Sequence, residues 1–456
     1  MNEKQKTLYF GGAAILLALL AIVTAPGHVT PDAFLDQGEL FFPDFQDPNE
    51  AETLEVIDYD PNTGTAIPFK VTFSGTNWTI PSHHNYAADG KDRLSKTAAG
   101  VIGITKDDIR SDNVSDHELC GVIDPLDETV TTLKGRGKRV TMKGVNDKVL
   151  ADFIVGNTVE NREGFRFVRV PGQKRIYAVR MNIDLSTNFA DWIEADLLKV
   201  DKAKINKVVL MDYSINERTQ RIESRDQVEL TKKDDVWSQN NMPADQVVDE
   251  DKISTFLTTL DELSIVGVRS KPEGLSATLM QSEGQITVSQ SDQVNLQGKG
   301  FYFTNDGSLR SNEGEMQAQT DDGLTYTLRF GEIVYGSGLA VSAGTEEAGE
   351  EASGENRYLF ITTNFDRNYF QEPGKPADFA FRTKPDSTWT DTDKRNKEIN
   401  DIYEQWQGKV DNGAALSKEL NDRFAKWYYV ISAESFDKLN LTRTDFLKAK
   451  EEEVIK

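Results

Sequence analysis

Four histidines and one cysteine are the side chains of this chain best suited to bind a transition metal. His83 and His84 are adjacent, and His117 is followed three residues later by Cys120. Imidazole and thiolate groups are the donors that zinc prefers. Adjacent histidines in a loop point apart, however, and no spacing fixes their distance from His117. We therefore interpret these residues as polar turn residues and predict no metal site.

Two other stretches resemble ion sites. Residues 58–64 (DYDPNTG) place oxygen donors at alternate positions, as a calcium loop does. Their glycine comes one position late and Phe69 stands where a bidentate glutamate is required, so we predict a tight hairpin turn instead. Residues 134–139 (KGRGKR) could hold a phosphate, but no helix follows that would direct its amides at the anion. We expect a surface hairpin there.

The sequence contains none of the common catalytic motifs: GxSxG, Walker A, HExxH, CxxC and GxGxxG are all absent. With four histidines, few groups could transfer protons near neutral pH. We predict that the protein is not an enzyme and has no catalytic residues and no cofactor. The alternative is an envelope hydrolase or glycan-binding protein whose carboxylates are scattered along the sequence.

The N-terminal segment is the most apolar part of the chain. Leu8 to Thr24 contains no charged or amide side chain, so we predict a transmembrane helix over residues 8–25. Lys4 and Lys6 precede it and acidic residues follow, which places the N-terminus in the cytoplasm and the remainder outside a bacterial inner membrane. A cleaved signal peptide is an alternative, although Pro26 would hinder cleavage. A buried core helix is another.

Composition excludes several partners. The formal net charge is −23 and the isoelectric point is near 4.7, which argues against nucleic acid and against anionic lipid surfaces. Since Cys120 is the one cysteine, it cannot form an internal disulfide, and the folded state must be stabilised by packing.

An internal repeat organises the chain. Each copy has a strand, a tryptophan and then a helix, and the intervals from Trp78 to Leu94 and from Trp237 to Ile253 are both sixteen residues. We predict an α+β protein with a duplicated α/β module of mixed or antiparallel sheets, in which both tryptophans are buried on their own helices. The domains expected are a stub and anchor (1–25), an extended tether (26–50), two modules (51–225 and 226–387) and a C-terminal helical region (388–456).

Several elements are predicted within this plan. Residues 188–198 favour a short helix, and residues 344–356 form an acidic, solvated loop in the second module. Two C-terminal helices, at 391–410 and 414–431, are expected to be separated by Asp411-Asn412-Gly413, with a third near 435–439. A helix cannot bury Trp427, Tyr428 and Tyr429 on one face, so we consider these three residues possible partner contacts.

The anchor, the repeated Trp–helix element, the segment Cys120 to Pro125 and residues 190–210 together resemble the domain of unknown function 4340 family. The resemblance covers roughly residues 50–370, and Gly90 and the Ala87-Ala88 pair depart from it in a turn. It implies a membrane-anchored envelope protein that assists a gliding-motility-type ABC transporter, with its permease and auxiliary subunits as partners. It implies no active site.

Overall fold

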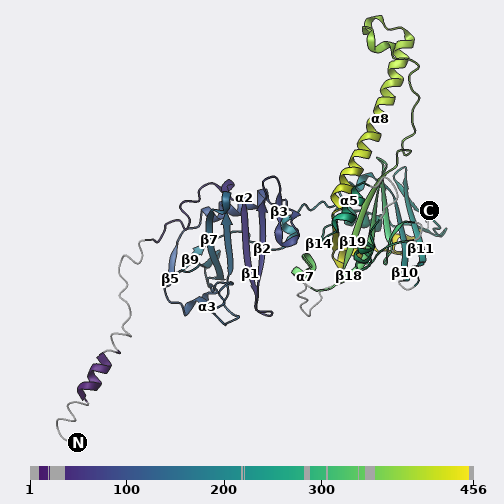
Figure 1. Ribbon diagram of the computed structural model, residues 1–456. Helices are drawn as coiled ribbons and strands as arrows, with labels where there is room; N and C mark the ends of the chain where they lie inside the picture. The colour runs from purple at the N-terminus through teal and green to yellow at the C-terminus, as the bar shows by residue number, and fades with distance from the viewer. Residues whose placement is uncertain are drawn as a thin grey trace, which may run out of the picture. The chain divides into compact units, whose positions relative to one another are not determined.

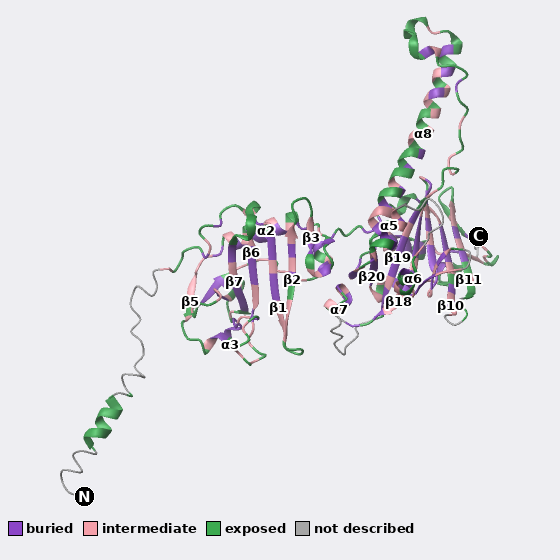
Figure 2. Cartoon of the chain, viewed as in Figure 1, coloured by how far each residue is buried: buried purple, intermediate pink, exposed green. Residues whose placement is uncertain are grey.

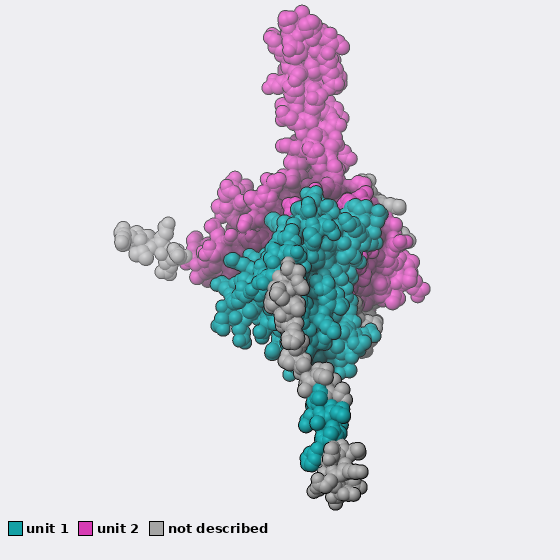
Figure 3. Space-filling view, turned by 90° about the vertical axis from the view of Figure 1, so that its left-hand side faces the viewer, with its two compact units in different colours: residues 1–67, 94–185 teal, residues 68–93, 186–456 magenta. Residues whose placement is uncertain are grey.

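The computed structural model describes residues 10–18, 20, 36–216, 219, 221–281, 288–304, 307–336, 338–344 and 355–450. The chain divides into two compact units, residues 1–67 with 94–185 and residues 68–93 with 186–456 (Figure 3). This division passes through strand β2 (Thr65–Phe73), so residues 68–73 of that strand are counted with the second unit.

The transmembrane helix expected over residues 8–25 is not found, and that prediction is corrected. Residues 10–18 and 20 are helical with exposed side chains, whereas residues 1–9, 19 and 21–25 lie outside the described part. Of the helices described, none combines the length and the apolar composition that a bilayer requires. The seventeen-residue apolar stretch would span about 25 Å, less than the roughly 30 Å of a hydrocarbon core.

The first sheet has nine strands in the order β4-β3-β2-β1-β6-β7-β8-β9-β5. Neighbouring strands from β1 to β5 in this order pair in antiparallel orientation. Two helices accompany the sheet, α2 (Lys91–Ile102) and α3 (Asp116–Cys120). The strands are β1 (Thr53–Asp60), β2, β3 (Trp78–Ile80), β4 (Tyr86–Ala87), β5 (Asp108–Ser111), β6 (Lys138–Lys143), β7 (Val149–Thr158), β8 (Phe165–Arg169) and β9 (Ile176–Arg180).

The second sheet has eight strands in the order β12-β11-β10-β17-β18-β19-β20-β14. They are β10 (Ile205–Asn216), β11 (Arg221–Lys233), β12 (Val236–Gln239), β14 (Gly267–Ser270), β17 (Glu315–Thr320), β18 (Leu324–Val334), β19 (Asn356–Phe365) and β20 (Trp427–Ile431). Two small sheets pair β13 (Gln246–Val248) with β21 (Leu447–Ala449) and β15 (Phe301–Phe303) with β16 (Leu309–Ser311). The helices are α4 (Glu250–Asp261), α5 (Glu273–Gln281), α6 (Gln290–Gln297), α7 (Leu339–Ser342), α8 (Asp391–Phe424) and α9 (Ala433–Leu439) (Figure 1).

Apart from β4, which has no counterpart in the second sheet, the two sheets have the same strand order. If β10, β11 and β12 take the places of β1, β2 and β3, then β17 to β20 take those of β6 to β9, and β14 takes that of β5. A helix, α2 or α4, precedes β5 or β14 in each case. The second copy starts at Ile205, so the expected boundary between residues 225 and 226 falls inside β11.

The repeated tryptophans are not the core residues that we expected. Trp78 and Trp237 both lie in the short third strand of their sheets, β3 and β12, and both are half-buried. Strand β12 is an edge strand and β3 has the two-residue β4 as its outer neighbour, so each indole is left partly exposed. The ring of Trp78 packs on Phe73, with centroids 5.4 Å apart.

Helix α4 agrees with its sequence pattern. Ile253, Phe256, Leu257 and Leu260 are its buried residues, which is the i, i+3, i+4, i+7 stripe of an amphipathic helix. The Asp249 side chain accepts a hydrogen bond from the backbone N–H of Asp251 and so caps the N-terminus. By contrast, the helix expected over residues 188–198 is reduced to the 3-10 turn Phe189–Trp192.

The segment expected to be an extended tether is partly folded. Residues 36–50 lie against the first unit: the Phe45 side chain is 1% exposed, and Phe41 packs edge-on against Tyr177. The backbone N–H groups of Gly38 and Phe41 donate to the carbonyls of Lys106 and Ile104. The side chains of Phe41 and Phe45 anchor this segment. Residues 345–354 of the expected acidic loop lie outside the described residues.

The C-terminal region differs most from expectation. Instead of two helices separated at residues 411–413, one helix of 34 residues, α8, runs from Asp391 to Phe424. Residues 427–431, expected to be helical, form β20, which pairs with β19 and β14. The predicted third helix is present as α9.

Candidate functional site

The structure does not bring the possible metal ligands together. His117 Nε2 lies 2.8 Å from the Lys174 carbonyl oxygen in the first unit, whereas His83 and His84 are counted in the second. Throughout the described ranges, no three His, Cys, Asp or Glu side chains form a group suited to a metal. Cys120 is buried, and burial raises the pKa of its thiol, so it is not a reactive thiolate.

One serine–histidine pair has the spacing of a nucleophile and its base. His83 Nε2 lies 2.9 Å from Ser342 Oγ, and His83 Nδ1 lies 2.9 Å from Ser82 Oγ. Acyl transfer also requires free N–H donors for the oxyanion. The amides of Ser342, Ala343 and Gly344 already donate to the carbonyls of Gly338 and Leu339. The arrangement therefore does not form a hydrolase site.

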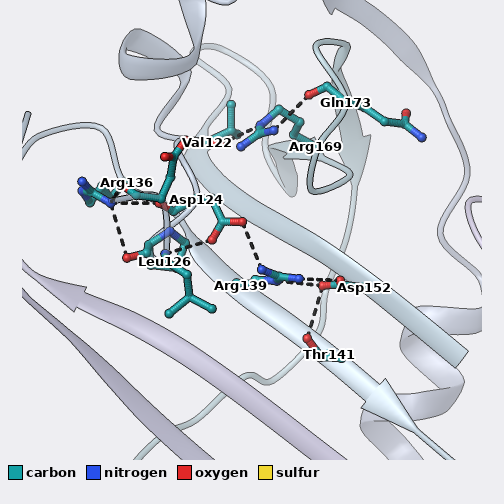
Figure 4. Close-up of polar contacts among 11 residues, drawn as sticks. Val122, Asp124, Leu126, Arg136, Arg139, Thr141, Asp152, Arg169 and Gln173 are labelled. Carbon is teal, nitrogen blue, oxygen red and sulfur yellow. Dashed lines mark hydrogen bonds and ion pairs between the residues drawn. The ribbon is translucent and has the colours of Figure 1, made fainter. Parts of the chain in front are cut away.

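The basic run at residues 134–139 is a structural element. Nη1 of Arg136 donates to the carbonyl oxygens of Asp124 and Asp127, and Nη2 to that of Val130. Arg139 forms ion pairs with the carboxylates of Asp124 and Asp152 at 3.1 and 2.7 Å (Figure 4). These contacts hold the loop before β6 against the sheet and use the donors that a phosphate would need. The 58–64 stretch is likewise the predicted turn, with Asn62 N–H donating to Asp60 Oδ1.

A shallow groove lies beside α4 and α9. Hydroxyl-bearing side chains line most of it: Ser254, Thr255, Thr258, Thr259, Ser264, Ser432 and Ser435. Several of these hydroxyls are already used within the protein, since Thr255 donates to the Asp251 carbonyl and Thr259 to that of Thr255. The described residues that line the groove include no aromatic side chain on which a sugar ring could stack. The groove gives no support to glycan binding.

The feature that distinguishes the second unit is an arm, which we define as α8 together with residues 366–390 leading to it. Figure 1 shows α8 projecting from the second sheet, with the preceding chain running beside it to the tip. In the first sheet, β8 and β9 are joined by residues 170–175, whereas in the second the corresponding strands β19 and β20 are joined through the whole arm. Much of the outer part of α8 is exposed (Figure 2).

The base of the arm is fixed to the sheet. Asn421 Oδ1 accepts from the Thr363 N–H at 2.8 Å, and Asn421 Nδ2 donates to the Thr363 carbonyl at 2.7 Å. Gly413 faces the ring of Phe365 so closely that a Cβ atom would overlap it. At the end of the helix, the buried Lys271 Nζ donates to the Phe424 carbonyl at 2.9 Å, where the helix dipole favours a cation. Burial lowers the Lys271 pKa well below its ordinary value.

The outer part of the arm is held by polar contacts. Its buried helix stripe consists of Asp393, Asn396 and Asn400, whereas nearer the sheet the stripe becomes apolar with Val410, Leu420 and Phe424. Asn396 Oδ1 accepts from the Ala377 N–H at 3.3 Å, and Asn400 Oδ1 accepts from Arg382 Nη2 at 3.1 Å. These side chains tie the leading chain to the helix.

A capping box starts α8. The Thr390 hydroxyl accepts from the Asp393 N–H, and the Asp393 carboxylate accepts from the Thr390 N–H. Lys384 Nζ also donates to that carboxylate at 2.8 Å. The hydrogen bonds from Lys384 and then from Thr390 lower the pKa of Asp393 to about 2.

A few apolar side chains lie at the tip and on the outer face of the arm. Phe381 is buried next to Trp389, whereas Phe379 is 48% exposed beneath the Arg382 guanidinium. Ile402, on the helix, is 51% exposed. The arm therefore presents isolated apolar side chains, Phe379 and Ile402, in a charged surface.

The aromatic residues proposed for partner contact lie elsewhere. Trp427, Tyr428 and Tyr429 belong to β20, and both tyrosine side chains are fully buried. Trp427 is half-buried against Tyr86, with ring centroids 4.9 Å apart. In a strand successive side chains point to opposite faces, and both faces are covered here, so neither tyrosine is available to a partner. That prediction is wrong for the tyrosines.

The sequence analysis expected possible partner contact in the C-terminal region but did not predict the arm. Two signals were available: the Thr390–Asp393 capping box, and the stripe of small and polar residues at helical spacing from Asp393 to Ser417. Asn412-Gly413 was interpreted as a helix break because glycine is a poor helix former. Gly413 instead allows α8 to pack closely on Phe365. This role cannot be predicted without knowing that Phe365 lies opposite.

The family comparison agrees with the sequence-based recognition. Residues 78–279 match the model of a family described as a domain of unknown function, DUF4340. The match starts at Trp78 in β3 and ends in α5, so the arm lies beyond it. Comparisons with curated proteins and with solved structures gave no match.

Proposed function

We propose, starting from the match of residues 78–279 to the DUF4340 family model, that the protein is a non-enzymatic interaction subunit whose arm binds its partner. The observation that carries the proposal is the arm itself. It is inserted at a position where the first sheet has a short turn, it lies outside the matched domain, and its base is fixed to the sheet.

The geometry of the arm supports a binding role better than a structural one. A helix that only stabilised the sheet would bury an apolar stripe along its whole length. In α8 the apolar stripe ends near Val410, and the buried asparagines of the outer turns bond residues 377 and 382 of the arm. Polar contacts hold the outer part of the arm away from the sheet. This cost in buried polar groups supports the proposal that the tip is the functional surface.

We propose the permease and auxiliary subunits of a gliding-motility-type ABC transporter as the partners, on the basis of the family resemblance. An extracytoplasmic location accompanies this proposal and stays a prediction. The absence of enzymatic activity is likewise a prediction, supported by the blocked oxyanion position at Ser342 and the inert Cys120.

The test is a crosslinked pull-down with the full chain and an arm-shortened variant. Trp406 Nε1 donates to the Phe370 carbonyl at 3.1 Å, so residues 370 and 406 are adjacent and a Gly-Ser linker can replace residues 372–404. The shortened protein should keep the unfolding temperature of the two sheets and lose the transporter subunits captured by the full chain.

A matched control keeps the arm and alters another exposed apolar residue, with Val236→Ser in β12. This variant should capture the same subunits as the unaltered chain. Undiminished capture by the folded, arm-shortened protein would refute the proposed role of the arm.

A further inference from the structure

Two adjacent histidines hold the segment that contains α7. His83 Nε2 lies 2.9 Å from Ser342 Oγ, and His84 Nε2 lies 2.8 Å from the carbonyl oxygen of Ala343. Arg269 Nη2 donates to the Ala340 carbonyl at 2.7 Å. Three basic side chains thus contact three positions of one short segment, all within the second unit.

The segment is seated closely against β14. A Cβ atom on Gly267 would overlap the backbone of Val341 and Ser342, and one on Gly344 would overlap the Arg269 side chain. Val341 is buried with Val334 and Val430. The histidine contacts therefore secure a packed element.

The surroundings of His83 disfavour a positive charge. Its side chain is 1% exposed and stacks on Phe189 with centroids 4.5 Å apart, and Phe69 packs edge-on against it. Its polar neighbours on its own turn and on α7 are the neutral hydroxyls of Ser82 and Ser342. The charged or titratable groups that act on it are His84, from the same turn, and Arg269, from β14. Both of these groups oppose protonation.

We propose that the His83–His84 turn is an acid-operated latch, which holds residues 338–344 at neutral pH and releases them when His83 takes up a proton. Protonation would bury a cation away from water and next to two basic side chains. Opening the segment lets the imidazolium reach water, so acid favours the open form.

The size of the effect follows from the two protonation equilibria. Burial, and then the charges of His84 and Arg269, lower the His83 pKa from 6.5 to about 4 in the closed form. If the open form has the ordinary value, the ratio of open to closed protein rises about 30-fold between pH 7.5 and pH 5.

Hydrogen exchange on the full chain tests this. The protection of residues 338–344, corrected for the pH dependence of intrinsic exchange, should fall about 30-fold between pH 7.5 and pH 5. Peptides from α4 should keep their protection and so exclude global unfolding. In His83→Gln the protection should not depend on pH. The matched control is His117→Gln, which removes an imidazole of the first unit and should retain the dependence.

A direct titration keeps the proposal falsifiable if a variant fails to fold. The imidazole carbon signals of His83 in the unaltered chain should report a pKa well below 6.5. A value near 6.5, unchanged protection between pH 7.5 and pH 5, or an unaltered pH response in folded His83→Gln would each overturn the latch.

Discussion

Asn421 shows how one side chain replaces a missing strand partner. Strand β20 pairs with β19 at Arg357 to Leu359, so the backbone of Thr363, further along β19, faces α8 instead of another strand. The Asn421 amide offers both an acceptor and a donor, and it bonds the N–H and the carbonyl of Thr363 together. The side chain thereby satisfies peptide groups that the sheet leaves unpaired.

Replacement of Asn421 by alanine should leave two partly buried backbone groups without partners. We expect Asn421→Ala to lower the free energy of unfolding by about 1–3 kcal/mol, measured by urea denaturation. The matched control is Asn412→Ala, an exposed asparagine on the same helix, which should change stability by less than about 0.5 kcal/mol. Equal effects of the two substitutions would show that the Thr363 contact contributes nothing.

Asp393 makes the tip of the arm sensitive to acid. Its folded-state pKa of about 2 lies below the ordinary 3.8, so its carboxylate stabilises the folded arm above pH 3.8. This contribution is lost as the pH falls from 3.8 through about 2. We expect the first turn of α8 to lose helicity in that window, as followed by carbon NMR shifts of residues 391–396. Asp393→Asn should abolish the transition, and a transition that survives in this variant would assign it to another group.

At the scale of the element, α8 carries two glycines with opposite requirements. A Cβ atom on Gly413 would overlap the Phe365 ring, whereas one on Gly408 would have no atom within 4 Å. Both residues lie inside the helix, where alanine is intrinsically favoured over glycine by about 1 kcal/mol. The pair therefore separates helix propensity from packing within one element.

We expect Gly408→Ala to stabilise the protein by about 0.5–1 kcal/mol and Gly413→Ala to destabilise it by about 1–3 kcal/mol, because the overpacked base must shift. Thermal unfolding followed by circular dichroism measures both changes. A stabilising Gly413→Ala would mean that α8 can move away from β19 at little cost.

The elements that sequence predicted well are those with local signals. Helix α4 has its stripe and its Asp249 cap, and the β1–β2 turn has Asp60, Asn62 and Gly64, so neighbours in sequence were sufficient. Strand β20 could not be predicted in this way. Tyr428 and Tyr429 follow a strong helical pattern, and a strand forms because β19 and β14, both distant in sequence, provide its hydrogen bonds. The arm could not be predicted for the same reason, because Gly413 is required by its packing on Phe365, which is distant in sequence.

At the scale of the whole molecule, the two sheets share a strand order and differ in what is inserted. The second copy carries α5, α6, β15 and β16 between β14 and β17, and the arm between β19 and β20. The strand order alone makes β20 an inner strand that lies between β19 and β14. The C-terminal region is therefore part of the second sheet as well as the source of the arm.

This arrangement predicts a contrast between two deletions. Removal of residues 388–456 eliminates β20 and leaves β14 without its strand partner, so we expect the second sheet to unfold and the protein to aggregate. Replacement of residues 372–404 by a linker keeps β20 and should preserve the fold. Near-ultraviolet circular dichroism and size-exclusion chromatography distinguish the two results. A monomeric, folded product of the first deletion would contradict the integration of β20.

The length of α8 has a mechanical consequence. A continuous helix of 34 residues measures about 51 Å, and a helix of this kind resists bending. Its last turns are fixed to the sheet at two points. Asn421 bonds Thr363 in β19, and the carbonyl of Phe424 accepts from Lys271, the residue directly after β14. The helix is thus a lever with a short inner end and a long outer one. A tilt of about 5° about Gly413, where the helix packs on Phe365, would displace the far end by roughly 3 Å, so small rearrangements among the strands would be magnified at the tip.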